Sequence, residues 1–239
     1  MHAPAPHTAR QQYWLGVRMF SPVAISIAAY GLVWGVLAGQ AGMSVLEVAL
    51  MSGLVFAGSS QFVVLDMWTP GNLPIVSIVI AALIVNLRLL LMSATLRPLL
   101  VPLPLPAALG ATFFVSDESW AMTMTEVRKG IGSVAFYLGT GTLCWLAWMA
   151  STLLGRVLGA FIDDPTKYGL DFAFTATFLA LLLGMWKGRG DLVPWIVAAL
   201  AAIATSRLIE GNWYIIVGGL VGSLAGALVE TLKERRHVG

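Results

Sequence analysis

Charged residues are scarce in this sequence. Aspartate, glutamate, lysine and arginine together make up 11% of the 239 residues, whereas hydrophobic residues make up 58%. A soluble domain has about 25% charged residues and at most about half apolar ones. Because a water-soluble fold could not bury so much apolar surface, we exclude that class and expect a protein that lies within a membrane.

Cysteine and histidine are almost absent as well. Cys144 is the single cysteine and lies in an apolar run, which excludes an internal disulfide and a cysteine-based metal site. The three histidines, His2, His7 and His237, lie in the tails, which excludes a histidine triad or metal site within a bundle. The sequence also lacks the GxxxxGK[ST] phosphate loop, so we expect no bound cofactor and no direct ATP hydrolysis. The net charge of +2 comes from scattered basic residues, a pattern that is not typical of nucleic-acid binding.

Long charge-free runs fill most of the sequence. They cover residues 19–46, 48–65, 67–87, 98–116, 130–155 and 211–229. Most of these runs reach the roughly 18 apolar residues that a membrane-spanning helix needs. Strands of a membrane barrel would alternate polar and apolar residues, whereas these runs are continuously apolar. The sequence therefore predicts an all-α, polytopic bundle of transmembrane helices that is not an enzyme.

We predict seven or eight spans, separated by segments rich in glycine, proline or aspartate. The candidate spans are 20–40, 45–68, 74–96, 107–125, 132–154, 169–186, 192–206 and 213–229. Span 107–125 is the weak member, because Asp117 and Glu118 would lie about halfway across the membrane. This segment either lines a polar interior or only dips into the membrane.

Basic residues set the expected orientation. Eight spans would place nine of them on one side: Arg10, Arg18, Arg128, Lys129, Lys187, Arg189, Lys233, Arg235 and Arg236. The positive-inside rule makes this side cytoplasmic. We therefore expect a cytoplasmic tail of residues 1–18, a single transmembrane domain of residues 19–231 and a cytoplasmic tail of residues 232–239.

The two halves of the sequence resemble each other. Gly53-Leu54-Val55-Phe56-Ala57 is followed by Phe62 and Met67-Trp68, and Gly169-Leu170-Asp171-Phe172-Ala173 is followed by Phe178 and Met185-Trp186. We interpret this as an internal three-helix repeat, with halves at about 16–97 and 132–207. Duplicated halves are common in transporters. The alternative is a chance recurrence of residues that are frequent in any membrane protein.

The most informative segment is the polar run Gly58, Ser59, Ser60 and Gln61, inside the second predicted span. Its three consecutive polar side chains would fan over about 200° of a regular helix, so they cannot share one buried face. A break at Gly58 would point the positive end of a half-helix inward, where it could bind a substrate carboxylate. The alternative is helix packing, in which Gly58 permits close approach and the serines bond their own backbone.

Charged residues inside the predicted spans are the other candidates. Arg88, two residues after Asn86, could clamp a substrate carboxylate, pair with Asp66, Asp117 or Glu118, or snorkel to the interface. Asp117 and Glu118 are candidate proton-coupling groups, because a buried carboxyl group can load and release protons. The alternative for both is a solvated loop tip between two half-spans. Asp66 is most simply an interfacial residue.

Four blocks in this order and spacing resemble the AzlC family: Phe56-Ala57-Gly58-Ser59-Ser60-Gln61-Phe62, Asn86-Leu87-Arg88, Asp117-Glu118-Ser119 and Gly169-Leu170-Asp171-Phe172-Ala173. The resemblance covers roughly residues 14–230. It implies the large subunit of a branched-chain amino-acid exporter in the bacterial inner membrane, working with a small membrane partner of the AzlD type. Leucine, isoleucine, valine, azaleucine and sometimes methionine would be the substrates. Family members often carry histidine where this chain has Leu89, which puts a proton relay at that position in doubt.

Our hypothesis is an alternating-access exporter driven by an ion gradient. The expected substrate-binding residues are Phe56, Gly58, Ser59, Ser60, Gln61, Phe62, Asn86 and Arg88, with the two phenylalanines around the branched side chain. The coupling or ion-pair candidates are Asp117, Glu118 and Asp66. Two alternatives remain open: a channel or scaffold subunit whose buried charges are structural, and an intramembrane enzyme with Ser59 or Ser60 as nucleophile.

Overall fold

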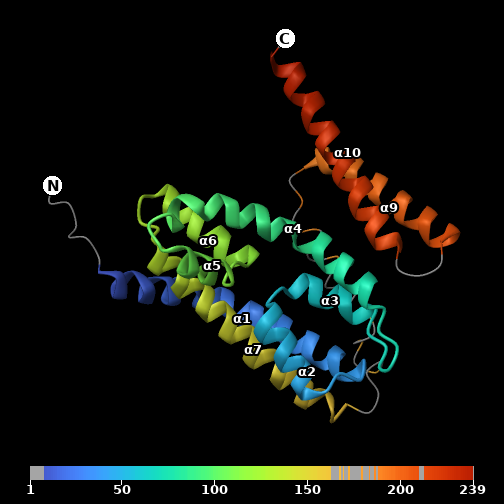
Figure 1. Ribbon diagram of the computed structural model, residues 1–239, viewed down its shortest axis with the longest axis horizontal. Helices are drawn as coiled ribbons and strands as arrows, with labels where there is room; N and C mark the ends of the chain where they lie inside the picture. The colour runs from blue at the N-terminus through green and yellow to red at the C-terminus, as the bar shows by residue number, and fades with distance from the viewer. Residues whose placement is uncertain are drawn as a thin grey trace. The chain divides into compact units, whose positions relative to one another are not determined.

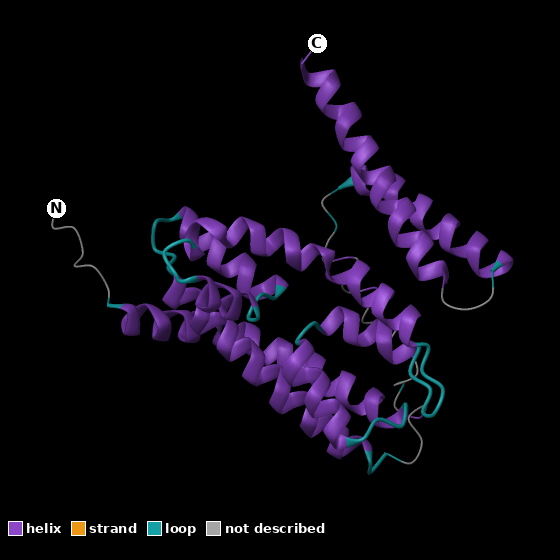
Figure 2. Cartoon of the chain, viewed as in Figure 1, coloured by secondary structure: helices purple, strands orange, loops and turns teal. Residues whose placement is uncertain are grey.

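The computed structural model describes residues 8–162, 167, 169, 172, 179, 183, 186, 188–209 and 213–238. These residues form helices and contain no strand (Figures 1 and 2), so the predicted all-α class is confirmed. The chain divides into two compact units. The first unit comprises Met1–Leu65 and Asn86–Asp164, and the second comprises Asp66–Val85 and Pro165–Gly239.

Part of the sequence prediction falls outside the described residues. The sixth predicted span, 169–186, is described only at isolated positions, and it contains the second copy of the repeated block. The internal repeat therefore stays a prediction, and so does a membrane crossing by segment 169–186.

The helices follow one another in a simple order. They are α1 (Ala9–Gln40), α2 (Val45–Leu50), the π-helix η1 (Met51–Val55), α3 (Gly58–Asp66), α4 (Ile75–Leu100), α5 (Leu105–Thr112), α6 (Asp117–Arg128), α7 (Val134–Gly159), the short 3₁₀ helix η3 (Arg189–Asp191), α9 (Leu192–Leu208) and α10 (Trp213–Val238). Hydroxyl side chains start several of them, because an N-cap oxygen can accept from N–H groups that the first helical turn leaves free. Thr8, Ser44, Ser116 and Ser133 occupy these positions before α1, α2, α6 and α7.

Helices α1 and α7 pack in parallel through the first unit (Figure 1). Gly16 of α1 lies over the backbone carbonyl of Phe136, and Gly139 of α7 lies over that of Tyr13. A Cβ atom on either glycine would collide with the carbonyl oxygen beneath it. The two backbones can therefore approach closely at this point only because both residues are glycine.

The same arrangement recurs further along the two helices. Gly35 lies over the carbonyl of Thr152, and Gly155 lies over that of Leu32. The two reciprocal glycine pairs fix the relative direction of the helices. Ala9 and Val134 consequently mark one end of the first unit, called here the Ala9 end, and Gln40 and Gly159 mark the other, called the Gln40 end.

The predicted second span folds back on itself. Helix α2 and the π-helix run inward from the Gln40 end, where Arg156 Nε donates to the carbonyl of Met43 over 2.6 Å. The π-helix ends at Phe56, and α3 returns beside it. Across the turn, Gln61 Nε2 donates to Ser52 Oγ over 3.4 Å. We call residues 45–66 the first hairpin. The break predicted for the second helix is confirmed, but the segment does not cross the bundle.

The predicted fourth span folds back as well. Helices α5 and α6 pack together with the start of α7, around a core of Leu96, Leu100, Ala111, Val115 and Tyr137. The Tyr137 hydroxyl, one turn into α7, donates to the carbonyl of Ala111 over 2.8 Å, which places the α5–α6 pair at the Ala9 end. We call residues 105–128 the second hairpin. The segment therefore folds back on itself instead of forming one continuous helix.

Three helices in the described part of the chain are long and apolar enough to cross a membrane: α1, α4 and α7. Of these three, α4 lies between α1 and α7 in the chain, and each hairpin enters and leaves at the same end, so it adds no crossing. The chain therefore crosses back once, in α4, and α1 and α7 run in the same direction. The predictions that segments 45–68 and 107–125 each cross the membrane need correction. The physical reason is that each contains a stretch whose polar side chains cannot all face one side of an unbroken helix.

In the second unit, α9 and α10 form an antiparallel pair. Gly218 and Gly222 of α10 pack on Ala202 and Ala198 of α9. Small residues at each contact allow the close approach that holds apolar helices together in lipid.

We expect Gly155→Ala to weaken the contact between α1 and α7. The added methyl group would collide with the carbonyl of Leu32, and overpacking of this kind costs about 1 to 3 kcal/mol. The melting temperature of the detergent-solubilised protein, followed by tryptophan fluorescence, should fall. Gly110→Ala is the matched control, because nothing lies within 4 Å of the added atom. Equal melting temperatures for both variants would contradict the glycine contact.

Candidate functional site

The candidate site begins at the turn of the first hairpin. Phe56 has a φ of 42° and a ψ of 49°, a left-handed conformation that is costly for a bulky residue. The turn lets α3 begin at Gly58, and the first turn of α3 lies beside α4, where Ser59 and Ser60 contact Arg88 and Asn86. The first N–H groups of a helix have no partner within it. The break therefore falls where the sequence predicts it, with Gly58 as the first residue of α3.

Arg88 connects the two hairpins. It lies near the middle of α4, and its Nη2 atom donates to Ser59 Oγ of the first hairpin over 2.6 Å. The same atom lies 2.9 Å from Asp117 Oδ2 at the start of α6 in the second hairpin. The side chains of Arg88 and Asp117 are 29% and 39% exposed in the described structure. Of the partners considered for this arginine, Asp117 is the one with which it pairs.

Asn86 and Ser60 form a second contact between α4 and the first hairpin. Ser60 Oγ donates its hydrogen to the carbonyl of Ala57, so toward Asn86 it can only accept. The Asn86 amide NH₂ group, at 3.2 Å from Ser60 Oγ, is the matching donor. This bond orients the Asn86 amide, with its NH₂ group toward Ser60. The carbonyl oxygen of Asn86 is then buried without a hydrogen-bond partner.

A free donor lies two residues further along α4. Arg88 Nε is buried and has no hydrogen-bond partner, although Nη2 of the same guanidinium bonds both hairpins. A buried donor or acceptor left without a partner is costly, and it indicates a ligand, an ion or a water molecule at that position. Asn86 and Arg88 thus offer one free acceptor and one free donor beside the start of α3.

Gln61 lies in a separate network on another side of α3. Its side chain is fully buried, with Nε2 bonded to Ser52 and Oε1 accepting from Trp148 Nε1 over 2.9 Å. Trp145 Nε1 also donates to the carbonyl of Gly53, within the π-helix, over 3.2 Å. These bonds hold the first hairpin against α7 and satisfy polar groups that hydrocarbon would not.

The aromatic residues of the predicted site have two different neighbours. The ring of Phe56, at the tip of the first hairpin, lies 5.9 Å from that of Phe113 at the tip of the second. The ring of Phe62 is buried and lies 4.9 Å from that of Tyr30 on α1. Phe56 therefore lies where the two hairpins meet, whereas Phe62 packs on α1.

The second hairpin presents Asp117 and Glu118 in the first turn of α6. Ser116 caps this helix, with Ser116 Oγ accepting from the backbone of Ser119 over 3.1 Å. Two carboxylates near a helix N-terminus are favoured by the helix dipole. Asp117 turns to Arg88, whereas Glu118 lines a groove of about 420 Å³ together with Met19, Val23, Ala121, Met122, Thr125 and Glu126.

Asp66 is not part of this cluster. It is exposed at the end of α3, and its carboxylate accepts from the hydroxyl of Tyr214 over 3.4 Å. The interfacial interpretation of Asp66 stays a prediction. The structure thus brings together Ser59, Ser60, Asn86, Arg88 and Asp117.

Three residues that contact the site were not predicted from the sequence: Phe113, Ser116 and Trp148. The pattern Ser116-x-x-Ser119 before a polar stretch is a helix-start signal that could have located the turn of the second hairpin. Phe113 and Trp148 give no such signal, because one aromatic residue in an apolar run looks like any other.

Comparison with known proteins identifies relatives over most of the chain. The family model described as AzlC protein matches residues 22–162. An uncharacterised membrane protein of Archaeoglobus fulgidus is 29% identical over 211 residues, which cover 87% of this chain and 89% of that protein. The branched-chain amino acid transport protein AzlC of Bacillus subtilis is 26% identical over 224 residues, 90% of this chain and 87% of that protein.

The inner membrane protein YgaZ of Escherichia coli is 26% identical over 241 residues, which cover 97% of this chain and 95% of that protein. No solved structure matches the chain. The family match takes in both hairpins, α4 and the cluster around Arg88. Because it covers more than half of the 239 residues, the chain belongs to the AzlC family of membrane proteins.

Proposed function

We propose that this chain is the large subunit of an inner-membrane exporter of branched-chain amino acids, with leucine, isoleucine, valine and methionine as substrates. The observation that carries the proposal is the cluster at the two hairpin tips, where Asn86 Oδ1 and Arg88 Nε are buried without partners. The name of the Bacillus subtilis relative, a branched-chain amino acid transport protein, supports the substrate class.

The two free groups complement the backbone of an amino acid. The substrate carboxylate accepts from Arg88 Nε and from the first N–H groups of α3, at the positive end of that helix. The substrate ammonium donates to Asn86 Oδ1. Ser59 and Ser60 hold the arginine and the asparagine in place.

Charge favours a neutral amino acid. Arg88 and Asp117 form an ion pair with no net charge, and a zwitterionic substrate adds none. A substrate with a charged side chain would bring an unpaired charge to membrane depth, which is costly. Phe56 and Phe113, which meet at the two tips, provide an apolar surface for the branched side chain.

The two hairpins provide the gates of an alternating-access cycle. They enter from opposite ends of the first unit and meet at Arg88, so displacing one of them opens the cluster toward one side of the membrane. Asp117 or Glu118 carries the coupling proton in this scheme, with Glu118 in a groove toward the Ala9 end. A small AzlD-like membrane subunit is the proposed partner, and both termini are cytoplasmic.

Counterflow in proteoliposomes tests the proposal. Vesicles with the purified chain are loaded with unlabelled leucine and given labelled leucine, valine, methionine or lysine, with and without the small subunit and a pH gradient. We expect saturable uptake of the first three and none of lysine. Non-saturable flux would support a channel, and lysine uptake equal to that of leucine would contradict the neutral-substrate site.

Asn86→Ala should weaken substrate binding. The variant removes the free acceptor, and a hydrogen bond to a charged group contributes about 1.5 to 3 kcal/mol, so we expect the half-saturating leucine concentration to rise roughly tenfold or more. The matched control is Asn72→Ala, since Asn72 is exposed in the turn before α4. Wild-type counterflow in Asn86→Ala would remove this residue from the site.

Glu118→Gln should separate binding from coupling. If Glu118 carries the coupling proton, leucine counterflow stays near the wild-type rate in the variant, but a pH gradient no longer drives net flux. Glu47→Gln serves as the control, because Glu47 is exposed at the start of α2. If a pH gradient still drives net flux in Glu118→Gln, the coupling proton is carried by another group. Asp117→Asn is then the next variant to measure.

A further inference from the structure

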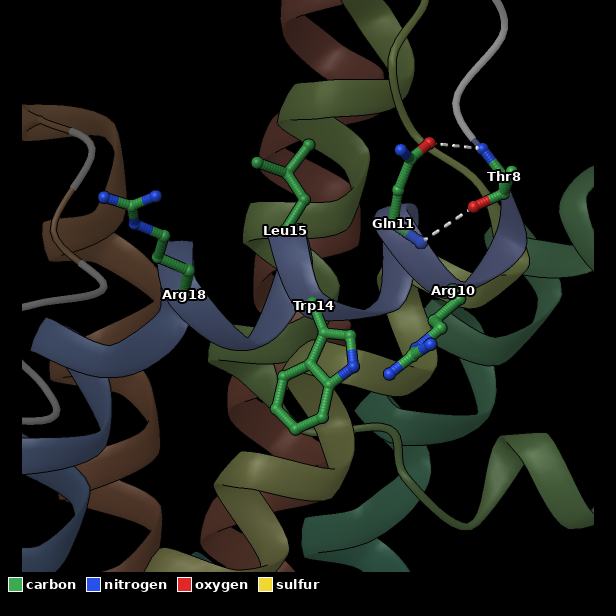
Figure 3. A pocket seen from close by; sticks show the side chains of 6 residues that line it. All are labelled: Thr8, Arg10, Gln11, Trp14, Leu15 and Arg18. Carbon is green, nitrogen blue, oxygen red and sulfur yellow. Dashed lines mark hydrogen bonds between the residues drawn. The ribbon is translucent and has the colours of Figure 1, made fainter.

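An exposed basic and aromatic stripe lies on the first turns of α1. Arg10, Trp14 and Arg18 are spaced four residues apart, which places them along one side of the helix. All three are exposed, and 58% of Trp14 is accessible. Together with Thr8, Gln11 and Leu15 they line a shallow groove of about 560 Å³, and Figure 3 shows the three residues in order along the first turns of α1.

The positive charge of this groove is not neutralised by its surroundings. Helix α1 contains no acidic residue, and no acidic residue lines the groove. Within the described residues, neither Arg10 nor Arg18 forms an ion pair with a carboxylate. The side chains of Thr8 and Gln11 accept from each other's backbone N–H groups over 2.8 and 3.3 Å (Figure 3). These two N–H groups at the start of α1 are therefore already bonded, and the positive charge of the groove comes from the two arginine side chains.

The length of α1 places the stripe at the membrane surface. Its 32 residues make a helix about 48 Å long, whereas the hydrocarbon core is about 30 Å thick. The helix is charge-free from Met19 onward, so that part lies in the core and the first turns extend into the headgroup layer. Indole rings favour this layer, which agrees with the exposed position of Trp14.

We propose that this groove binds the headgroup of an anionic phospholipid. The guanidinium groups of Arg10 and Arg18 pair with the phosphate and with the net negative charge of the headgroup. Trp14 and Leu15 contact the glycerol region and the start of the acyl chains. A lipid at this position tethers the start of α1, which packs along α7 through the Gly16 and Gly139 contact.

Native mass spectrometry of the full-length protein in detergent tests the site. Phosphatidylglycerol or phosphatidylcholine is titrated into the wild type, the double variant Arg10→Gln/Arg18→Gln, Trp14→Ala and the control Arg97→Gln/Arg128→Gln. The control removes the same charge from exposed arginines outside the groove, at the ends of α4 and α6. A melting curve for each variant checks that it is folded.

We expect one tightly retained phosphatidylglycerol on the wild type, bound at least fivefold more strongly than phosphatidylcholine. Arg10→Gln/Arg18→Gln should abolish this preference, Trp14→Ala should reduce it, and the control should keep it. An equal loss in both double variants would overturn the proposal, because the attraction would then be diffuse. Displacement of the lipid by an equal concentration of inorganic phosphate would overturn it too, since a free anion would then be the ligand.

Discussion

A guanidinium group halfway along a membrane-spanning helix cannot face hydrocarbon unpaired, because the cost of burying a bare charge there is several kcal/mol. Arg88 meets this constraint by bonding Asp117 of one hairpin and Ser59 of the other. Each partner comes from a helix start at the tip of a hairpin, so the arginine can be satisfied only if both hairpins reach the middle of the bundle. The polar cluster is therefore complete only when both hairpins are in place.

The two hairpins satisfy polar backbone groups at their turns in different ways. In the first, the π-helix and the left-handed turn at Phe56 free backbone groups, and Trp145 satisfies one of them at Gly53. In the second, Ser116 caps α6 and leaves Asp117 free for Arg88. Irregular backbone is tolerated inside a membrane only where protein or a polar cavity surrounds it. The parallel glycine-mediated contact of α1 and α7 provides the rigid surface on which the first hairpin rests.

The polar groups that the ion pair leaves unbonded decide which ligands the cluster can bind. The ion pair between Arg88 and Asp117 cancels its own charge, while Asn86 Oδ1 and Arg88 Nε keep unused bonding capacity. A ligand with a donor at one end and an acceptor at the other, and no net charge, fits these two requirements together. Such a ligand would lie beside the Nη2 atom of Arg88, which contacts one hairpin from each end of the first unit.

The sequence by itself determined the membrane class and the all-helical fold, and it offered a break at Gly58 and the residues of the polar cluster as candidates, because continuous apolar runs and isolated polar residues within them are local properties. Only the tertiary structure decided that segments 45–68 and 107–125 turn back, that Arg88 pairs with Asp117 and that Gln61 faces Trp148. A hairpin and a crossing helix can have the same hydropathy. Which of them forms depends on the partners that satisfy the polar groups at the turn, and these come from helices distant in the chain.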